Sequence, residues 1–128
     1  MSGPRVEFFF DLSSPWTRLA FANLWPMLER TGEQAVLRPI LVGGVFNAVN
    51  PAVYAAREDA GNRRLQHSWK VLGDWARLAG VTMNFPSVYH PAKSVNAMRM
   101  ACALEGNQTA LRTFTAAVFE SYFGAQEN

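Results

Sequence analysis

The chain has 128 residues, of which 49% are apolar, and a formal net charge of +2, which suits one soluble globular domain. The charge is small and scattered and no apolar stretch could span a bilayer, so neither a nucleic-acid nor a membrane partner is expected. Cys102 is the only cysteine, which excludes an internal disulfide and a cysteine–histidine metal cluster. Because a basic region followed by a long apolar run is missing from the N-terminus, no signal peptide is expected, and we predict a cytoplasmic protein.

The first predicted element is a β-strand over residues 6–11, Val-Glu-Phe-Phe-Phe-Asp. Three consecutive phenylalanines are typical of a strand buried on both faces of a parallel sheet. Asp11 ends this strand as a buried carboxylate or a cap of the following loop, and we assign it no catalytic role.

An α-helix is predicted next. Ser14 stands at an N-cap position and Pro15 at the first helical position, where its missing N–H costs nothing. The helix should run to about Arg30, be kinked or shortened by Pro26 and stop at Gly32. Its expected buried stripe comprises Trp16, Leu19, Ala20, Asn23, Leu24 and Met27.

A second strand is predicted over residues 35–42. Because Pro39 cannot donate a ladder hydrogen bond, this is an edge strand or a strand that ends at that residue. A strand, a helix and a strand at this spacing form a βαβ unit with parallel pairing. With two strands, one edge of the first strand stays unpaired, so we expect residues 1–128 alone to be poorly stable or to self-associate.

After a predicted loop over residues 43–51, the pattern becomes helical. One helix ends at Gly80, residues 81–91 form an extended connection, and Ser94 caps a helix in which Cys102 faces the core. The last helix follows a break at Gly106-Asn107 and is lined by Leu111, Phe114, Val118 and Tyr122. We therefore predict an α/β chain with a βαβ unit over residues 1–48 and a helical domain over residues 49–128.

The stretch Ser14-Pro15-Trp16-Thr17 carries the most chemical information. It stands between strand and helix, where thioredoxin-like redox proteins carry Cys-x-x-Cys. Both cysteine positions hold hydroxyls here, so a disulfide oxidoreductase is rejected. A hydroxyl can donate to an external thiolate, and a helix start favours negative charge. We predict a site that binds and activates an external thiol.

Each candidate residue also has an ordinary structural interpretation. Ser14 can be only a helix cap, a role compatible with holding a thiolate. Thr17 can be an ordinary first-turn residue, which we favour. Trp16 can wall a substrate pocket or pack in the core, and we favour the core. Asn50 and Arg64 could reach over the site, although exposed loop polarity is the default for both.

The chain resembles 2-hydroxychromene-2-carboxylate isomerases and kappa-class glutathione transferases, from the DsbA-like branch of the thioredoxin superfamily. The most specific matching segments are residues 6–17 and the stretch Gly43-Gly44-Val45-Phe46. Further matches are Leu37-Arg38-Pro39, Asp74-Trp75-Ala76, Gly80-Val81, Phe85-Pro86 and Ala97-Met98-Arg99. The resemblance covers essentially the whole chain. Family members continue into two antiparallel strands and a helix, so it implies that this C-terminal ββα part is absent here.

The resemblance implies roles for individual residues. Ser14 matches the catalytic serine that hydrogen-bonds the glutathione sulfur, and Asn50 and Arg64 match positions that contact this cofactor. Thr17 is a further candidate for binding it, as a second hydroxyl near the same sulfur. The implied substrate pocket contains Trp16 and Phe46. Departures from the family pattern are His67, where many members have tyrosine, and Arg64 and Asn47, where lysine is common.

The implied activity is a glutathione-dependent cis–trans isomerase that acts on 2-hydroxychromene-2-carboxylate-type intermediates of aromatic degradation. Two alternatives remain open: a kappa-like transferase that conjugates glutathione to electrophiles, and a non-catalytic thioredoxin-like binding domain. The expected partners are a small-molecule substrate and, in the full-length protein, a second copy in a homodimer. No metal is expected.

Overall fold

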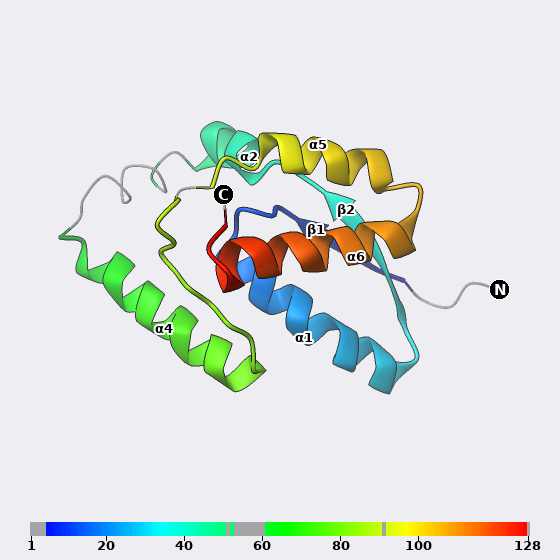
Figure 1. Ribbon diagram of the computed structural model, residues 1–128, viewed down its shortest axis with the longest axis horizontal. Coiled ribbons are helices and arrows are strands. Elements are labelled where there is room, and N and C mark those ends of the chain that lie inside the picture. Colours follow the sequence, from blue (N-terminus) through cyan, green and yellow to red (C-terminus); the bar gives the residue numbers. More distant parts are fainter. Residues whose placement is uncertain (1–4, 51, 53–60, 91, 128) are drawn as a thin grey trace.

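The computed structural model of the protein describes residues 5–50, 52, 61–90 and 92–127 (Figure 1). Its N-terminal part is a βαβ unit formed by β1 (Arg5–Phe10), α1 (Pro15–Thr31) and β2 (Gln34–Pro39). The strands pair in parallel, with Phe8 opposite Leu37. The predicted βαβ unit and its parallel pairing are therefore confirmed.

Both ends of α1 have the predicted caps. The Ser14 hydroxyl oxygen accepts a hydrogen bond from the Thr17 N–H at 3.2 Å. Gly32 ends the helix in the left-handed conformation, with a φ of 70° that suits glycine, and its N–H donates to the Leu28 carbonyl. Pro26 lies inside the helix without shortening it, so that part of the expectation is wrong.

Four α-helices and a π-helical turn follow among the described residues. They are α2 (Val42–Val49), α4 (Arg63–Ala79), α5 (Val95–Leu104), α6 (Gln108–Phe119) and η1 (Glu120–Gly124). The predicted helix that ends at Gly80 and the break at Gly106-Asn107 are confirmed. The loop predicted from Gly43 is wrong, because residues 42–49 are helical. Tyr122 belongs to the π-helical turn and not to the last α-helix.

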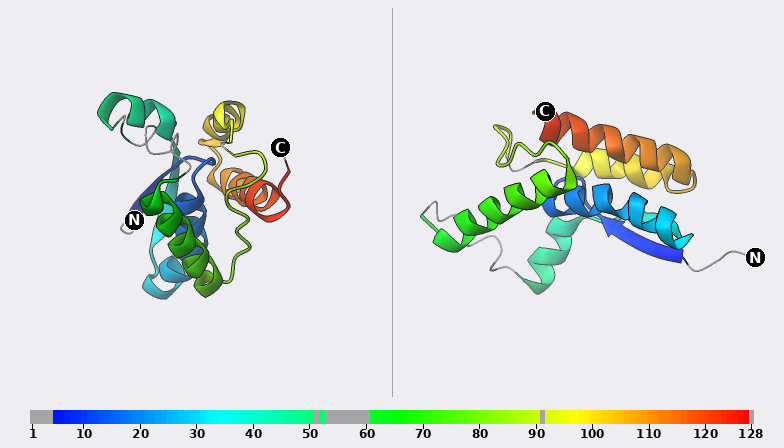
Figure 2. Two further views of the ribbon diagram at one scale, coloured as in Figure 1. Left: turned by 90° about the vertical axis from the view of Figure 1, so that its left-hand side faces the viewer. Right: turned by 90° about the horizontal axis from the view of Figure 1, so that it is seen from below.

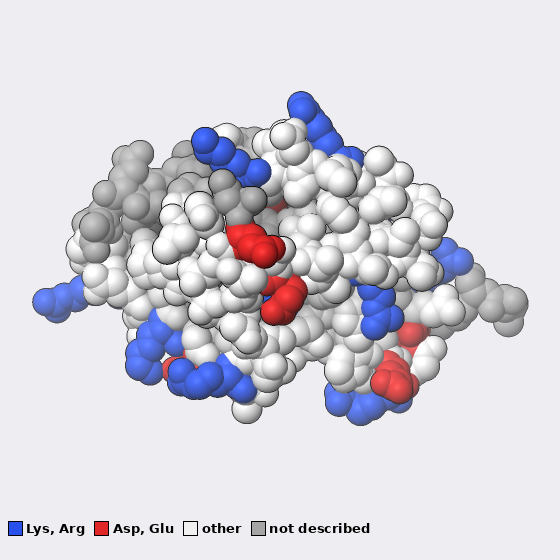
Figure 3. Space-filling model, viewed as in Figure 1, with Lys and Arg blue, Asp and Glu red and all other residues white. Residues whose placement is uncertain are grey.

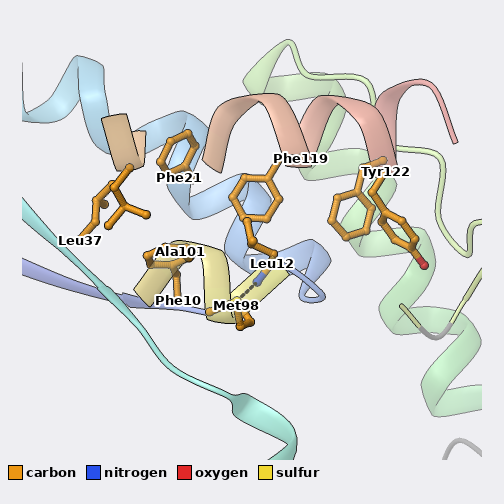
Figure 4. Close-up of a cluster of buried hydrophobic side chains, with 10 residues drawn as sticks. Phe10, Leu12, Phe21, Leu37, Met98, Ala101, Phe119 and Tyr122 are labelled. Carbon is orange, nitrogen blue, oxygen red and sulfur yellow. Dashed lines mark hydrogen bonds between the residues drawn. The ribbon is translucent and has the colours of Figure 1, made fainter. Parts of the chain in front are cut away.

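The main hydrophobic cluster joins the βαβ unit to α5 and α6 (Figure 4). It contains Phe10, Leu12, Phe21, Leu37, Met98, Ala101, Leu111, Phe119, Tyr122 and Phe123. A smaller cluster places Leu19 of α1 against Leu72 and Ala76 of α4, which lies beside α1 (Figures 1 and 2). The two segments predicted as separate domains thus share one core, and the boundary at residue 48 stays a prediction.

Burial corrects three expectations. The strand β1 is not buried on both faces, since Phe10 is buried but Phe9 is 56% exposed. The physical reason is that successive side chains of a strand point to opposite faces, and the main hydrophobic cluster covers the face of Phe10 but does not include Phe9. Trp16 and Met27 are exposed on α1, while Cys102 is exposed on α5.

The buried face of α1 follows a different stripe from the expected one. Leu19 and Leu24 are buried as predicted, but the other buried residues are Arg18, Phe21 and Leu28. This face meets the C-terminal helices, because the rings of Phe21 and Phe119 lie 5.5 Å apart. The Arg18 guanidinium donates to the Glu120 carboxylate at 2.9 Å. These contacts anchor α1 to the end of α6.

The two edges of the sheet differ. On the outer edge of β2, the Gln108 side chain accepts from the Leu37 N–H at 2.7 Å and donates to the Leu37 carbonyl at 3.2 Å. The Phe10 carbonyl accepts from the Ile40 N–H, so the alternation of a parallel strand turns the main-chain groups of Phe9 towards the opposite edge. No described residue pairs with the main chain of Phe9 there.

Candidate functional site

Ser14 and Trp16 present two hydrogen-bond donors at the start of α1. Pro15 has no N–H, while Thr17 N–H donates to the Ser14 hydroxyl oxygen and Arg18 N–H donates to the Ser14 carbonyl at 3.1 Å. The Trp16 N–H and the Ser14 hydroxyl hydrogen therefore remain, and neither has an acceptor among the described residues. The first turn of α1 thus keeps two donors for an external acceptor.

These two donors suit an anion. The N-terminal end of a helix carries a partial positive charge, which stabilises negative charge within its first turn. A thiolate at this position would accept hydrogen bonds from the Ser14 hydroxyl and the Trp16 N–H. Both interactions favour the ionised form of the sulfur, which is its nucleophilic form.

The loop before Ser14 is held by a buried carboxylate. Asp11 is 1% exposed, and its Oδ1 accepts from the Ser13 N–H at 2.8 Å and from the Ser94 hydroxyl at 3.0 Å. Its Oδ2 accepts from the Val42 N–H at 2.9 Å. The sequence left two interpretations of Asp11 open, a buried carboxylate and a cap of the following loop. The structure shows a buried carboxylate that also binds the loop. Ser94 stands at the N-cap position of α5, but its side chain binds Asp11 instead of capping the helix.

Leu12 adds a further contact to this loop. Its N–H points at the Met98 sulfur of α5 at 3.3 Å, the dashed line in Figure 4. The sequence showed neither Ser94 nor Met98 as part of the site's surroundings. The one available signal was a carboxylate directly after a buried strand, which must find donors in the fold.

A hollow of about 550 Å³ lies between the start of α1 and the N-terminal half of α4. Its lining residues are Trp16, Asn62, Arg64, Leu65, His67, Ser68 and Val71. Trp16 is 44% exposed, so the favoured expectation of core packing is wrong and its side chain contributes to a hollow. The structure thus brings Trp16 of α1 together with Arg64 and His67 of α4, although Trp16 is far from both in the sequence.

Two predicted site residues lie elsewhere. Phe46 and Asn50 belong to the last turn of α2 and its C-cap, where the Asn50 N–H donates to the Phe46 carbonyl at 2.9 Å. Neither lines the hollow. The side chain of Thr17 is partly buried in the first turn of α1.

The surface and the helices place few further constraints on chemistry. Basic and acidic side chains are scattered over the face shown in Figure 3 and do not gather in one patch. Among the described residues, no three histidine, cysteine or carboxylate side chains could together hold a metal ion. No helix in that part of the chain is long and apolar enough to cross a membrane.

A parallel βαβ unit joined to a helical block, with hydroxyls at the start of its first helix, defines a thioredoxin-like α/β protein without a dithiol. The chain belongs to the family of DsbA-like thioredoxin domains, whose profile matches residues 5–128. The fold is similar to a solved structure of a 2-hydroxychromene-2-carboxylate isomerase, with a TM-score of 0.71 and 22% sequence identity.

That similarity covers 97% of this chain and 58% of the solved chain, so this chain spans less than two thirds of the protein it matches. A comparison with curated proteins gives no match. These findings confirm the DsbA-like thioredoxin family and the α/β thioredoxin-like fold class inferred from the sequence.

Proposed function

We propose that the protein is a glutathione-dependent cis–trans isomerase of 2-hydroxychromene-2-carboxylate-type substrates from aromatic degradation. The observation that carries the proposal is the pair of unpartnered donors at the start of α1, the Ser14 hydroxyl and the Trp16 N–H. Ser14 stands at the first of the two positions where dithiol members of the superfamily carry cysteines, and Trp16 lies between those two positions. The similarity to a solved isomerase structure supports the same reading at the level of the fold.

When bound, glutathione supplies a thiolate that adds reversibly to a conjugated substrate and so turns a locked double bond into a rotatable single bond. Ser14 holds the sulfur and does not act as the nucleophile. The start of α1 stabilises the negative charge of the sulfur before addition and after elimination. A single thiol suffices for this chemistry, in agreement with a chain whose one cysteine lies on α5.

The other predicted residues take supporting roles in this proposal. Trp16 offers an apolar wall for the substrate, while the Arg64 guanidinium is available to a carboxylate in the hollow beside it. Thr17, in the first turn of α1, is a further proposed contact of glutathione. Asn50 and Phe46 stay predictions for the glutathione and substrate sites, since neither lines the hollow beside Trp16. A cytoplasmic location and a homodimer of the full-length protein belong to the same proposal.

Product analysis tests the proposal against its two alternatives. The purified protein is mixed with glutathione and a 2-hydroxychromene-2-carboxylate, and both the substrate absorbance and the free thiol are followed. Isomerisation with full recovery of free glutathione is the expected result. A stable thioether instead would identify a kappa-like transferase. Absence of glutathione binding by calorimetry in a folded sample would identify a non-catalytic domain.

A further inference from the structure

Three helix starts converge on the buried carboxylate of Asp11. Its hydrogen-bond donors are the Ser13 N–H just before α1, the Val42 N–H in the first position of α2 and the Ser94 hydroxyl at the N-cap of α5. The three distances lie between 2.8 and 3.0 Å. Asp11 therefore links three elements that are distant in the sequence.

This carboxylate has no cationic partner among the described residues. A buried charge of this kind is stable only if its oxygens are fully hydrogen-bonded. Two of the donors are backbone N–H groups at helix starts, where the positive end of the helix dipole adds to the hydrogen bond. The cluster is satisfied only while all three elements keep their relative positions.

The same cluster fixes the geometry of Ser14. Besides the carboxylate bond to Ser13, the Asp11 carbonyl accepts from the Ser14 N–H at 3.2 Å. Both bonds close the turn between β1 and α1 and hold Ser14 in its extended conformation, with φ of −92° and ψ of 119°. That conformation turns the Ser14 hydroxyl towards the first turn of α1.

We propose that Asp11 is the positioning residue of the thiol site: it aligns the Ser14 hydroxyl with the start of α1 and ties both to α2 and α5. This inference rests on the proposed function, because binding of a thiol is the reason for which the alignment of Ser14 would matter. It concerns a residue that does not touch the thiol and acts through Ser13 and Ser14.

An electrostatic role and a positioning role of Asp11 predict opposite changes in the pKa of the bound thiol when Asp11 is substituted. A nearby negative charge raises the pKa of a bound thiol, so removing the charge alone would lower that pKa and increase the thiolate fraction. Loss of the alignment removes donors from the sulfur and raises the pKa. The direction of the change therefore separates a positioning role from a purely electrostatic one.

Asp11→Asn keeps the size of the side chain but leaves one acceptor oxygen for two backbone N–H groups, so one of them loses its partner. Ser94→Ala removes only the link to α5. Asp74→Asn, which changes an exposed aspartate on α4, is the matched control. Circular dichroism and thermal unfolding establish that each variant is folded at the assay temperature.

Glutathione affinity is measured by calorimetry, and the pKa of the bound thiol by the ultraviolet absorbance of its thiolate. For Asp11→Asn we expect affinity to fall by about tenfold or more and the thiol pKa to rise, the effect of losing one hydrogen bond to a charged group. Ser94→Ala should give a smaller change in the same direction, and the double variant should be no worse than Asp11→Asn. Asp74→Asn should match the wild type.

An unchanged or lowered thiol pKa in folded Asp11→Asn and Ser94→Ala would overturn the proposal. A second readout does not depend on glutathione: amide hydrogen exchange should accelerate at residues 12–17 and 42–44 in Asp11→Asn but not in Asp74→Asn. If the wild type binds no glutathione, the proposed function fails. Faster exchange would then still establish the alignment, and unchanged exchange would refute it.

Discussion

Ser14→Ala separates the two tasks that we assign to this hydroxyl. The substitution removes the acceptor of the 3.2 Å hydrogen bond from the Thr17 N–H, an N-cap loss that costs about 1 kcal/mol of unfolding free energy. It also removes one of the two donors available to a bound thiolate. A hydrogen bond to a charged group contributes about 1.5–3 kcal/mol, so we expect glutathione affinity or turnover to fall by about tenfold to a hundredfold.

A second N-cap in the chain provides the control. The Asn107 side chain accepts from the Ala110 N–H at 3.1 Å at the start of α6, an equivalent cap on another helix. Asn107→Ala should therefore lose a similar unfolding free energy and leave glutathione affinity unchanged. Ser14→Thr keeps a hydroxyl at the cap and should recover much of the loss.

The assay compares urea unfolding with glutathione titration for all three variants. The pKa of the bound thiol is expected to rise in Ser14→Ala and to stay unchanged in Asn107→Ala. The reasoning would be refuted if Ser14→Ala and Asn107→Ala lost equal stability and bound glutathione equally well. In that case Ser14 would be a cap and nothing more.

Three further predictions concern the surroundings of the site. Gln108→Ala leaves the buried Leu37 N–H and carbonyl without partners and should cost about 1–3 kcal/mol in urea unfolding; an unchanged midpoint would contradict this. Burial raises the pKa of the Tyr122 phenol, against a weaker opposing effect of the Ser87 hydroxyl. Its contribution to stability is thus present below the unfolded pKa of about 10 and is lost as the pH rises towards the folded value, so Tyr122→Phe should flatten the alkaline decline in unfolding free energy. The 128-residue chain should self-associate through the open edge of β1, and Phe9→Lys should reduce the apparent mass in light scattering; a monodisperse monomeric wild type would contradict this.

The βαβ unit could be predicted because its signals are local. Ser14 and Pro15 mark the start of α1, Gly32 its end, and the apolar runs on either side mark the strands. The helix that ends at Gly80 could be predicted in the same way, because a glycine after a helical pattern favours a left-handed C-cap. The exposure of Phe9 on β1 could not be predicted, because three consecutive phenylalanines do not indicate whether one or both faces of the sheet are covered.

The helix α2 could not be predicted because its start depends on a distant residue. Two glycines in its first turn favour a loop, and Leu41 at its N-cap provides no side-chain hydrogen bond. The Val42 N–H instead binds Asp11, which lies 31 residues earlier. The grouping of Trp16 with Arg64 and His67 was hidden for a similar reason, since it depends on how α4 packs beside α1.

The distribution of donors around Asp11 explains how a buried carboxylate and an external thiolate could share one region. The Asp11 carboxylate and a thiolate are like charges, so they oppose each other near one helix start. Asp11 would also block the proposed thiol site if it bound the Trp16 N–H itself. Its oxygens are instead taken by Ser13, Val42 and Ser94, which hold it behind the turn. The Ser14 hydroxyl and the Trp16 N–H are left for a ligand. If a thiolate binds there, as we propose, the repulsion from Asp11 would cost part of its stabilisation, while the fixed turn would keep both donors in place without reorganisation.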